Sequence, residues 1–312
     1  MNLIGKIVHE LKYEMEVPMP YGLFHLVTLL CIAICIVLIC ISNKKRSEFK
    51  LKFALGMFGY TSLIFEIIKQ LIWSTSYNPS TGITTWDYQW YGFPFQFCST
   101  PMYAACIATF LKEGKLRRAL TSYIGYFTIL GSLMVMLIPT DIYQIHTLIN
   151  IHTTILHAGG LVLSLFLLIH RYVKPKWSYF FSGFIVYCIC VLVAETLNVC
   201  VYKSGVLNGE TFDMFFISPF FKTGMPVFTI VEQYVNDVLY VIIYVFAFML
   251  GSSIVFFISR AKEKKEYSLR ELHKLQIEYI ERFNLPFKFN NRDKKDALRL
   301  LRKSLEENKP YI

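Results

Sequence analysis

A cysteine and two histidines are the residues of this sequence that could together perform nucleophilic chemistry. Cys98 ends the segment FPFQFC at 93–98, and His152 and His157 lie in a later apolar stretch. A thiol becomes nucleophilic when a neighbouring base or positive charge favours the thiolate. We expect Cys98 to be a catalytic nucleophile with His157 or His152 as its base, if the fold brings the side chains together. The alternative, in which Cys98 is a buried and inert small hydrophobe, stays open.

Neither a metal nor another cofactor is expected. His152 and His157 are five residues apart, which turns their side chains about 140° from each other on a regular helix. Two rings so placed do not bind one ion. The eight cysteines form no CxxC pair, so a zinc ribbon or a redox pair has no support either.

Composition and charge indicate a membrane protein. Of 312 residues, 54% are hydrophobic and 17% are charged, whereas an ordinary domain is about 45–50% apolar and about 25% charged. The mean hydropathy is +0.44. These values exclude a disordered chain, a coiled coil and a disulfide-rich secreted module, and they argue against a soluble enzyme. The net charge of +10 therefore indicates membrane topology, and we do not expect nucleic acid as a partner.

The apolar stretches predict an all-α, polytopic membrane protein with seven transmembrane helices. A helix needs about 20 apolar residues to cross a bilayer. Residues 1–20 are polar and form an N-terminal segment, and residues 21–258 form the transmembrane domain. The predicted spans are 21–42, 53–73, 93–111, 119–138, 147–169, 177–201 and 227–258.

Lys and Arg predict the orientation, because short cytoplasmic loops are enriched in them. The first, third and fifth loops and the segment 259–312 carry most of the 32 basic residues, whereas the second and fourth loops carry none. We therefore expect an extracellular N-terminus and a basic, helical cytoplasmic tail in a multi-pass protein of the cell membrane. The spacing of apolar residues in the tail predicts helices at 267–283 and 293–305. It is either a solvated hairpin or a surface that contacts anionic lipid headgroups.

Polar side chains within the spans concentrate in the half of the membrane that this orientation makes the outer one. Such groups are costly in a bilayer and usually mark a functional interior. We expect a polar, substrate-binding cavity there. In it, Glu66 and Lys69 pair at i, i+3, and the histidines are the partners or proton donors of Glu195 and Asp237. The alternative is that each group snorkels to the interface. Besides the cysteine and histidines above, the expected cavity residues are His25, Glu66, Lys69, Gln70, Gln96, Asn150, Glu195, Asn198, Gln233 and Asp237.

The segment 85–97, TWDYQWYGFPFQF, precedes Cys98 and contains seven aromatic residues. One interpretation is an aromatic belt at the membrane interface. The other is a lid, or a guide for an acyl chain, over the cavity.

At these residues the sequence resembles the YwaF-type integral membrane proteins, which are related to eukaryotic multi-pass proteins with acyl-transfer activity on ether phospholipids. The resemblance covers roughly residues 18–258 and rests on short pieces: FHL at 24–26, Glu66 with Lys69 and Gln70, 93–98, PTD at 139–141, LHAG at 156–159 and the aromatic segment 212–219. It implies a thiol nucleophile assisted by histidine that passes an acyl chain to a lysolipid or to water. That family usually places a histidine where Gln96 stands, so the base would have to be His152 or His157.

Two other functions stay open. Intramembrane carboxylates and histidines also suit a proton-coupled transporter or permease, although the polar set stops at mid-depth and we detect neither a Walker A loop nor an internal repeat. The other possible function is that of a seven-helix receptor or an assembly scaffold. Membrane lipids are the expected partners of the first function, and the sequence carries no signal for an oligomeric state.

Overall fold

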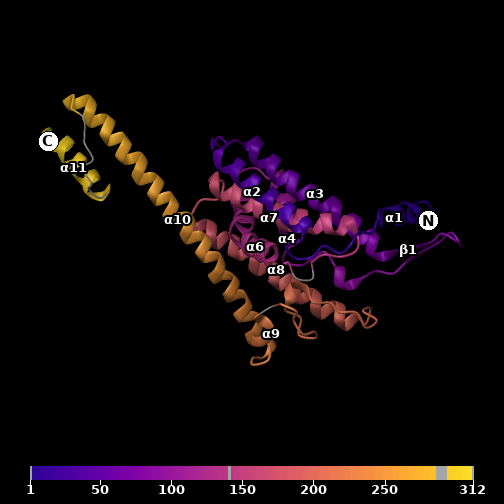
Figure 1. Ribbon diagram of the computed structural model, residues 1–312. Helices are drawn as coiled ribbons and strands as arrows, with labels where there is room; N and C mark the ends of the chain where they lie inside the picture. The colour runs from indigo at the N-terminus through magenta and orange to yellow at the C-terminus, as the bar shows by residue number, and fades with distance from the viewer. Residues whose placement is uncertain (1, 140–141, 226, 286–293, 311–312) are drawn as a thin grey trace. The chain divides into compact units, whose positions relative to one another are not determined.

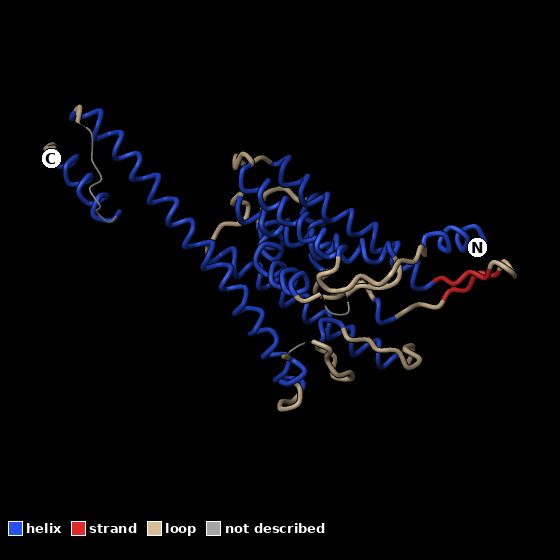
Figure 2. Tube along the Cα trace, viewed as in Figure 1, coloured by secondary structure: helices blue, strands red, loops and turns tan. Residues whose placement is uncertain are grey.

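The computed structural model describes residues 2–139, 142–225, 227–285 and 294–310. Nearly all regular structure in these residues is helical, with a single β-hairpin (Figures 1 and 2). The chain divides into two compact units, residues 1–255 and 256–312, which we call the bundle unit and the tail unit. The expected all-α class is thus confirmed.

Six helical segments of the described residues are long and apolar enough to cross a membrane. Four are single helices: α2 (Leu23–Ile41), α3 (Glu48–Ser74), α7 (Thr147–Ile169) and α8 (Trp177–Ser204). The fifth, Lys115–Leu137, joins α5 (Lys115–Tyr123), the π-helical turn η2 (Ile124–Thr128) and α6 (Ile129–Leu137). The sixth, Asp237–Glu263, is the first part of α10 (Asp237–Phe283).

The predicted third span, 93–111, has a different structure. Residues 93–99 are irregular, and a helix forms only over α4 (Thr100–Phe110). At a rise of about 1.5 Å per residue, its 11 residues extend for only about half of the roughly 30 Å hydrocarbon thickness. Pro94 and Pro101 explain the late start, since proline is tolerated in the first turn of a helix but not within it. The count of seven spans therefore stays a prediction.

Small residues bring the helices of the bundle close together. A Cβ on Gly59 of α3 would lie 2.9 Å from the backbone nitrogen of Cys106 in α4. A Cβ on Gly183 of α8 would lie 2.8 Å from the Ser122 and Tyr123 backbone in α5. These glycines allow the backbone contact between α3 and α4 and between α8 and α5, in the way that small residues do in membrane helices. The helix α7 packs on α3 and α6.

One end of the bundle unit carries the β-hairpin, and we call it the hairpin end. There β1 (Thr75–Asn78) continues α3 and pairs antiparallel with β2 (Ile83–Trp86). The N-terminal helix α1 (Asn2–Leu11) packs on the hairpin (Figure 2). Val8 of this helix is buried. The short helices η1 (Trp90–Gly92), η3 (Met214–Phe216) and α9 (Phe228–Val231) lie in the segments that follow β2 and α8. The start of α7 and the end of α8 belong to the same end.

The tail unit consists of the last part of α10 and α11 (Lys294–Glu307). Its two helices agree with the predicted helices at 267–283 and 293–305, except that residue 293 belongs to the range 286–293, which lies outside the described part of the chain. A small apolar core holds the unit together, formed by Leu272, Tyr279, Ala297, Leu301 and Leu305.

Candidate functional site

A cavity in the bundle unit contains the predicted nucleophile and both candidate bases. It has a volume of about 310 Å³, and Cys98, His152, His157, Lys69 and Gln96 are part of its wall. The wall also contains the aromatic side chains of Trp73, Tyr91, Phe93 and Phe216. Residues from α3, α7 and the segments before α4 and α9 thus meet at one place.

The helix α7 places both histidines on the cavity. His152 and His157 are 4% and 8% exposed. Ile149, Thr153 and Leu156 also line the cavity, and in a helix of 3.6 residues per turn they form a stripe whose two edges are the histidines. Although the two rings point in different directions around the helix, both His152 and His157 line the cavity.

Glu66 of α3 is the centre of a buried polar cluster. Its Oε2 lies 2.9 Å from His152 Nε2, and its Oε1 lies 2.6 Å from Lys69 Nζ. Gln70 Nε2 donates to Oε1 over 2.8 Å. The predicted Glu66–Lys69 pair is confirmed, and the histidine that meets a carboxylate is His152. Glu66 is only 2% exposed. A buried charge is tolerated when it is paired and hydrogen-bonded, and the three partners of Glu66 meet this condition.

The same cluster holds the aromatic segment 85–97 against α3. The carbonyl oxygen of Gly92 accepts hydrogen bonds from Lys69 Nζ at 3.1 Å and Gln70 Nε2 at 2.6 Å. A Cβ on Gly92 would lie 2.4 Å from the ring of Trp73, so the close approach requires glycine here. The Lys69 ammonium in turn lies 4.8 Å from the centre of the Trp73 ring. The segment therefore forms one wall of the cavity, through Tyr91 and Phe93.

Cys98 lies just before the N-terminus of α4. Ser99 is the N-cap residue and Thr100 begins the helix. The Cys98 side chain is half-buried, and its thiol is free, as are those of the other cysteines. Irregular backbone at membrane depth is tolerated where it is buried in protein or lines a cavity. The irregular segment 93–99 meets this condition, since several of its residues line the cavity.

Two of the predicted binding residues hold the backbone of the segment after α8. Gln96 Nε2 donates to the Asp213 carbonyl over 2.7 Å, and Gln96 Oε1 accepts from the Phe215 N–H over 2.9 Å. Asn198 binds both backbone groups of Met214, over 2.8 and 3.1 Å. Phe215 has φ of 61°, a strained conformation for a residue with a side chain, which these two amides maintain.

Asn150 does the same for the segment before α7. Its Oδ1 accepts from the Gln144 N–H over 2.8 Å, and its Nδ2 donates to the Gln144 carbonyl over 2.7 Å. The Gln144 side chain then accepts from Trp73 Nε1 over 3.3 Å. Asn150 is fully buried and acts on the cavity through the position of Gln144, which lines it.

His25 lies outside the cavity. Its Nδ1 accepts from the Tyr21 N–H over 3.0 Å, and its Nε2 lies 3.0 Å from the Met136 carbonyl oxygen. The ring is fully buried and joins the start of α2 to the end of α6.

Glu195, Gln233 and Asp237 are also absent from the cavity wall. Gln233 and Asp237 are exposed, and Asp237 is the first residue of α10. Among the described residues, the carboxylate that binds a histidine belongs to Glu66, so the expected pairing of histidine with Glu195 or Asp237 is not what the structure shows.

The structure adds wall residues that the sequence analysis missed. Trp73 follows Lys69 by four residues, so helical spacing alone could have placed it on the same face. Gln144 comes from the irregular segment before α7, and Phe216 comes from η3 within the aromatic segment 212–219. The spacing of residues in the sequence does not place either of them beside Cys98. Of the family-like segment 139–141, residues 140 and 141 lie outside the described part of the chain.

Comparison with known families then shows what kind of protein carries this site. The model of the TMEM164 family matches residues 20–244, a range that contains the whole cavity wall. The chain belongs to the TMEM164 family. Its membership and the six apolar helices support an integral, multi-pass membrane protein. Comparison with curated proteins gives no match, and comparison with solved structures gives none either.

Proposed function

We propose that this protein is a membrane-embedded, lipid-modifying enzyme of the cell membrane that transfers or hydrolyses an acyl chain through Cys98. One observation carries the proposal: Cys98, His152 and His157 line one cavity. A cysteine in apolar surroundings needs a base to become a nucleophile, and two histidines line the same cavity as Cys98. The resemblance to the YwaF-type proteins and their acyl-transferring relatives supplies the reaction type.

The two histidines have different surroundings. His152 Nε2 is bound by Glu66, which orients the ring. His157 Nδ1 has no hydrogen-bond partner among the described residues. A neutral imidazole with a free nitrogen can accept a proton. We therefore assign the role of base to His157 and a supporting, oriented role to His152.

The reaction proceeds in two balanced steps. His157 takes the thiol proton, the Cys98 sulfur bonds to the ester carbonyl carbon, and the ester C–O bond breaks. The leaving lysolipid oxygen takes the proton from His157, and the acyl chain remains as a thioester. In the second step the hydroxyl of a lysolipid or of water gives its proton to His157 and attacks the thioester. The C–S bond breaks, and the thiolate recovers the proton.

The cavity wall suits such a substrate. Tyr91, Phe93, Phe216, Ile149 and Leu156 offer apolar surface for an acyl chain next to the thiol. Gln96 does not replace the histidine that the resembling family carries there, since both ends of its amide bind the backbone after α8. The base therefore comes from α7.

A thiol-directed probe with a long acyl chain tests the proposal. We expect wild type to be labelled and Cys98→Ser to remain unlabelled, because the reactive thiolate forms only at Cys98. Cys106→Ser is the matched control, since Cys106 is a half-buried cysteine of α4 that does not line the cavity. His157→Gln is expected to lower the labelling rate by about 10²-fold, the usual contribution of a general base.

Lipid profiles of membranes that contain wild type or Cys98→Ser complete the test. We expect the acyl composition of phospholipids to differ between the two. Equal labelling of wild type and Cys98→Ser would remove Cys98 as nucleophile. Unchanged lipids together with altered solute uptake would favour the transporter function instead.

A further inference from the structure

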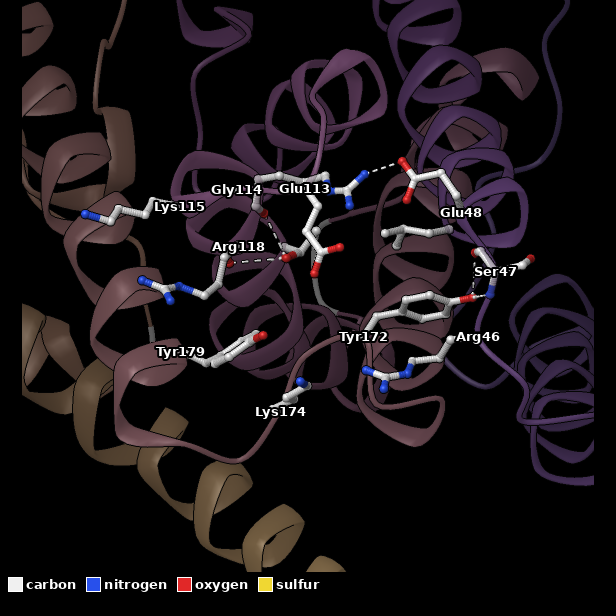
Figure 3. A pocket seen from close by; sticks show the side chains of 13 residues that line it. Arg46, Ser47, Glu48, Glu113, Gly114, Lys115, Arg118, Tyr172, Lys174 and Tyr179 are labelled. Carbon is white, nitrogen blue, oxygen red and sulfur yellow. Dashed lines mark hydrogen bonds and ion pairs between the residues drawn. The ribbon is translucent and has the colours of Figure 1, made fainter.

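A second cavity lies at the opposite end of the bundle unit from the β-hairpin. It has a volume of about 570 Å³ and shares no residue with the cavity at Cys98 (Figure 3). The starts of α3, α5 and α8 and the segment after α7 form its wall. Five basic side chains line it: Arg46, Lys115, Arg117, Arg118 and Lys174.

The acidic side chains of this cavity neutralise only part of its positive charge. Glu48 forms an ion pair with Arg117, which is 6% exposed, and this pair is marked in Figure 3. Glu113 is exposed and is the other acidic residue of the wall. Among the described residues, no carboxylate is paired with Lys115 or Lys174. The cavity therefore has a surplus of positive charge.

Arg118 is already positioned in the wall. Its guanidinium lies 5.5 Å from the centre of the Tyr179 ring, and its Nε is buried without a hydrogen-bond partner among the described residues. A buried donor without a partner is unfavourable, so a bound acceptor would stabilise it. A guanidinium can contact an aromatic ring and also bind a phosphate through its N–H groups.

The N-terminus of α5 adds to the same positive potential. The first N–H groups of a helix have no partner within the helix and carry a partial positive charge that favours anions. Lys115 begins α5, and its N-cap residue Gly114 provides no side-chain acceptor. Both residues line the cavity. Ser47 at the N-cap of α3 also lines it, but its own hydroxyl accepts the Lys50 N–H. The cavity wall thus combines the uncapped N-terminus of α5 with side-chain cations.

We propose that this cavity binds a phosphate group, carried either by the headgroup of an anionic membrane lipid or by a soluble phosphate compound. Both sources offer the same chemistry, a compact anion with several acceptor oxygens that guanidinium and ammonium groups bind. The cavity is large enough for a headgroup, since small-molecule sites have volumes of about 300–1,000 Å³. Its place at the ends of the membrane-length helices α3 and α8 fits the depth at which lipid phosphates lie.

Titration of the purified full chain in neutral detergent tests this site. Native mass spectrometry measures binding of phosphatidylglycerol, with phosphatidylcholine of the same acyl chains as the neutral comparison. The cavity variants are Lys115→Gln/Lys174→Gln and, separately, Arg118→Gln. Lys44→Gln/Lys45→Gln is the matched control, because these exposed residues do not line the cavity and the same charge is removed. In a second arm, inorganic phosphate is titrated calorimetrically at fixed ionic strength.

We expect phosphatidylglycerol or inorganic phosphate to bind wild type and the control equally, and each cavity variant about tenfold more weakly. Binding of phosphatidylglycerol that inorganic phosphate does not displace assigns the site to lipid headgroups, and binding of inorganic phosphate by itself assigns it to soluble phosphates. Absence of binding in both arms overturns the proposal, as does equal loss in the control. If Arg118→Gln does not fold, the lysine pair decides, since Lys115 is exposed and neither lysine forms an ion pair among the described residues.

Discussion

At the scale of single residues, Glu66 explains how a charged cluster can lie between α3 and α7. Its carboxylate binds Lys69, Gln70 and His152 at once. Removal of one partner from a buried pair typically costs about 3–5 kcal/mol, because the other charge stays buried without compensation. We therefore expect Glu66→Gln to lower the thermal unfolding temperature of the protein in detergent, measured by intrinsic fluorescence.

A double-mutant cycle separates the interaction energy of the Glu66–Lys69 ion pair from the effect of changing each side chain by itself. Glu66→Gln, Lys69→Met and the double variant are compared with Glu14→Gln, which removes an exposed acid. The double variant should lose clearly less stability than the sum of the two single variants, since it leaves no unpaired ammonium. Additive losses would mean that the two charges do not interact in the folded protein.

The residues that line the cavity with Cys98 could be predicted in part, but the roles of the amides could not. Helical spacing alone predicted the contact of Glu66 with Lys69, because i, i+3 neighbours share a helix face. An amide has one donor and one acceptor group and so matches any peptide group. Gln96 and Asn198 bind the backbone of the segment after α8, whereas Asn150 binds that of Gln144, six residues before it. Which backbone groups each amide binds depends on the fold of these irregular segments and not on a local pattern of residue types.

At the scale of elements, hydropathy predicted the long helices well but not the extent of the helix within residues 93–111. The stretch is apolar enough for a span, yet its first part folds as an irregular cavity wall and only Thr100–Phe110 is helical. A window of hydropathy reports that a segment avoids water. It does not distinguish a helix that faces lipid from backbone that is buried by other helices.

The segment between α8 and α10 has a pH-sensitive connection at Asp213. Asp213 Oδ1 accepts the Ser218 N–H over 2.8 Å, while burial raises the pKa of this carboxyl to about 7, with the nearby Glu232 adding to the effect. Its pKa in an unfolded chain is about 3.9. The folded state therefore favours the protonated carboxyl, so the contribution of Asp213 to stability is complete below about pH 4 and is lost as the pH rises through about 7.

We expect the thermal unfolding temperature of wild type to fall between pH 5 and pH 8 and that of Asp213→Asn to vary less over this window. The asparagine keeps an acceptor for Ser218 but does not titrate, which isolates the carboxyl from other groups that respond to pH. Unfolding curves at several pH values in one detergent give the comparison. The same pH dependence in both proteins would show that Asp213 does not titrate in this range.

At the scale of the whole molecule, the distribution of Lys and Arg predicts the orientation of the protein in the membrane. The basic cavity at the start of α3 and α5 belongs to the bundle unit, and the tail unit carries many further basic residues. Positively charged segments remain on the cytoplasmic side of a membrane protein. The cavity with Cys98 contains Lys69 and Trp73 from the other end of α3, so the distribution predicts that it opens to the outer leaflet.

Accessibility of single added cysteines tests this orientation. Asn208→Cys lies in the exposed segment after α8, and Glu306→Cys lies on an exposed position of α11. In intact cells, an impermeant maleimide should label Asn208→Cys above the wild-type background and leave Glu306→Cys at that background. Permeabilised cells are the control, in which both variants should react because both positions are exposed to water. Labelling of Glu306→Cys in intact cells would reverse the orientation, and with it would place the Cys98 cavity on the cytoplasmic leaflet.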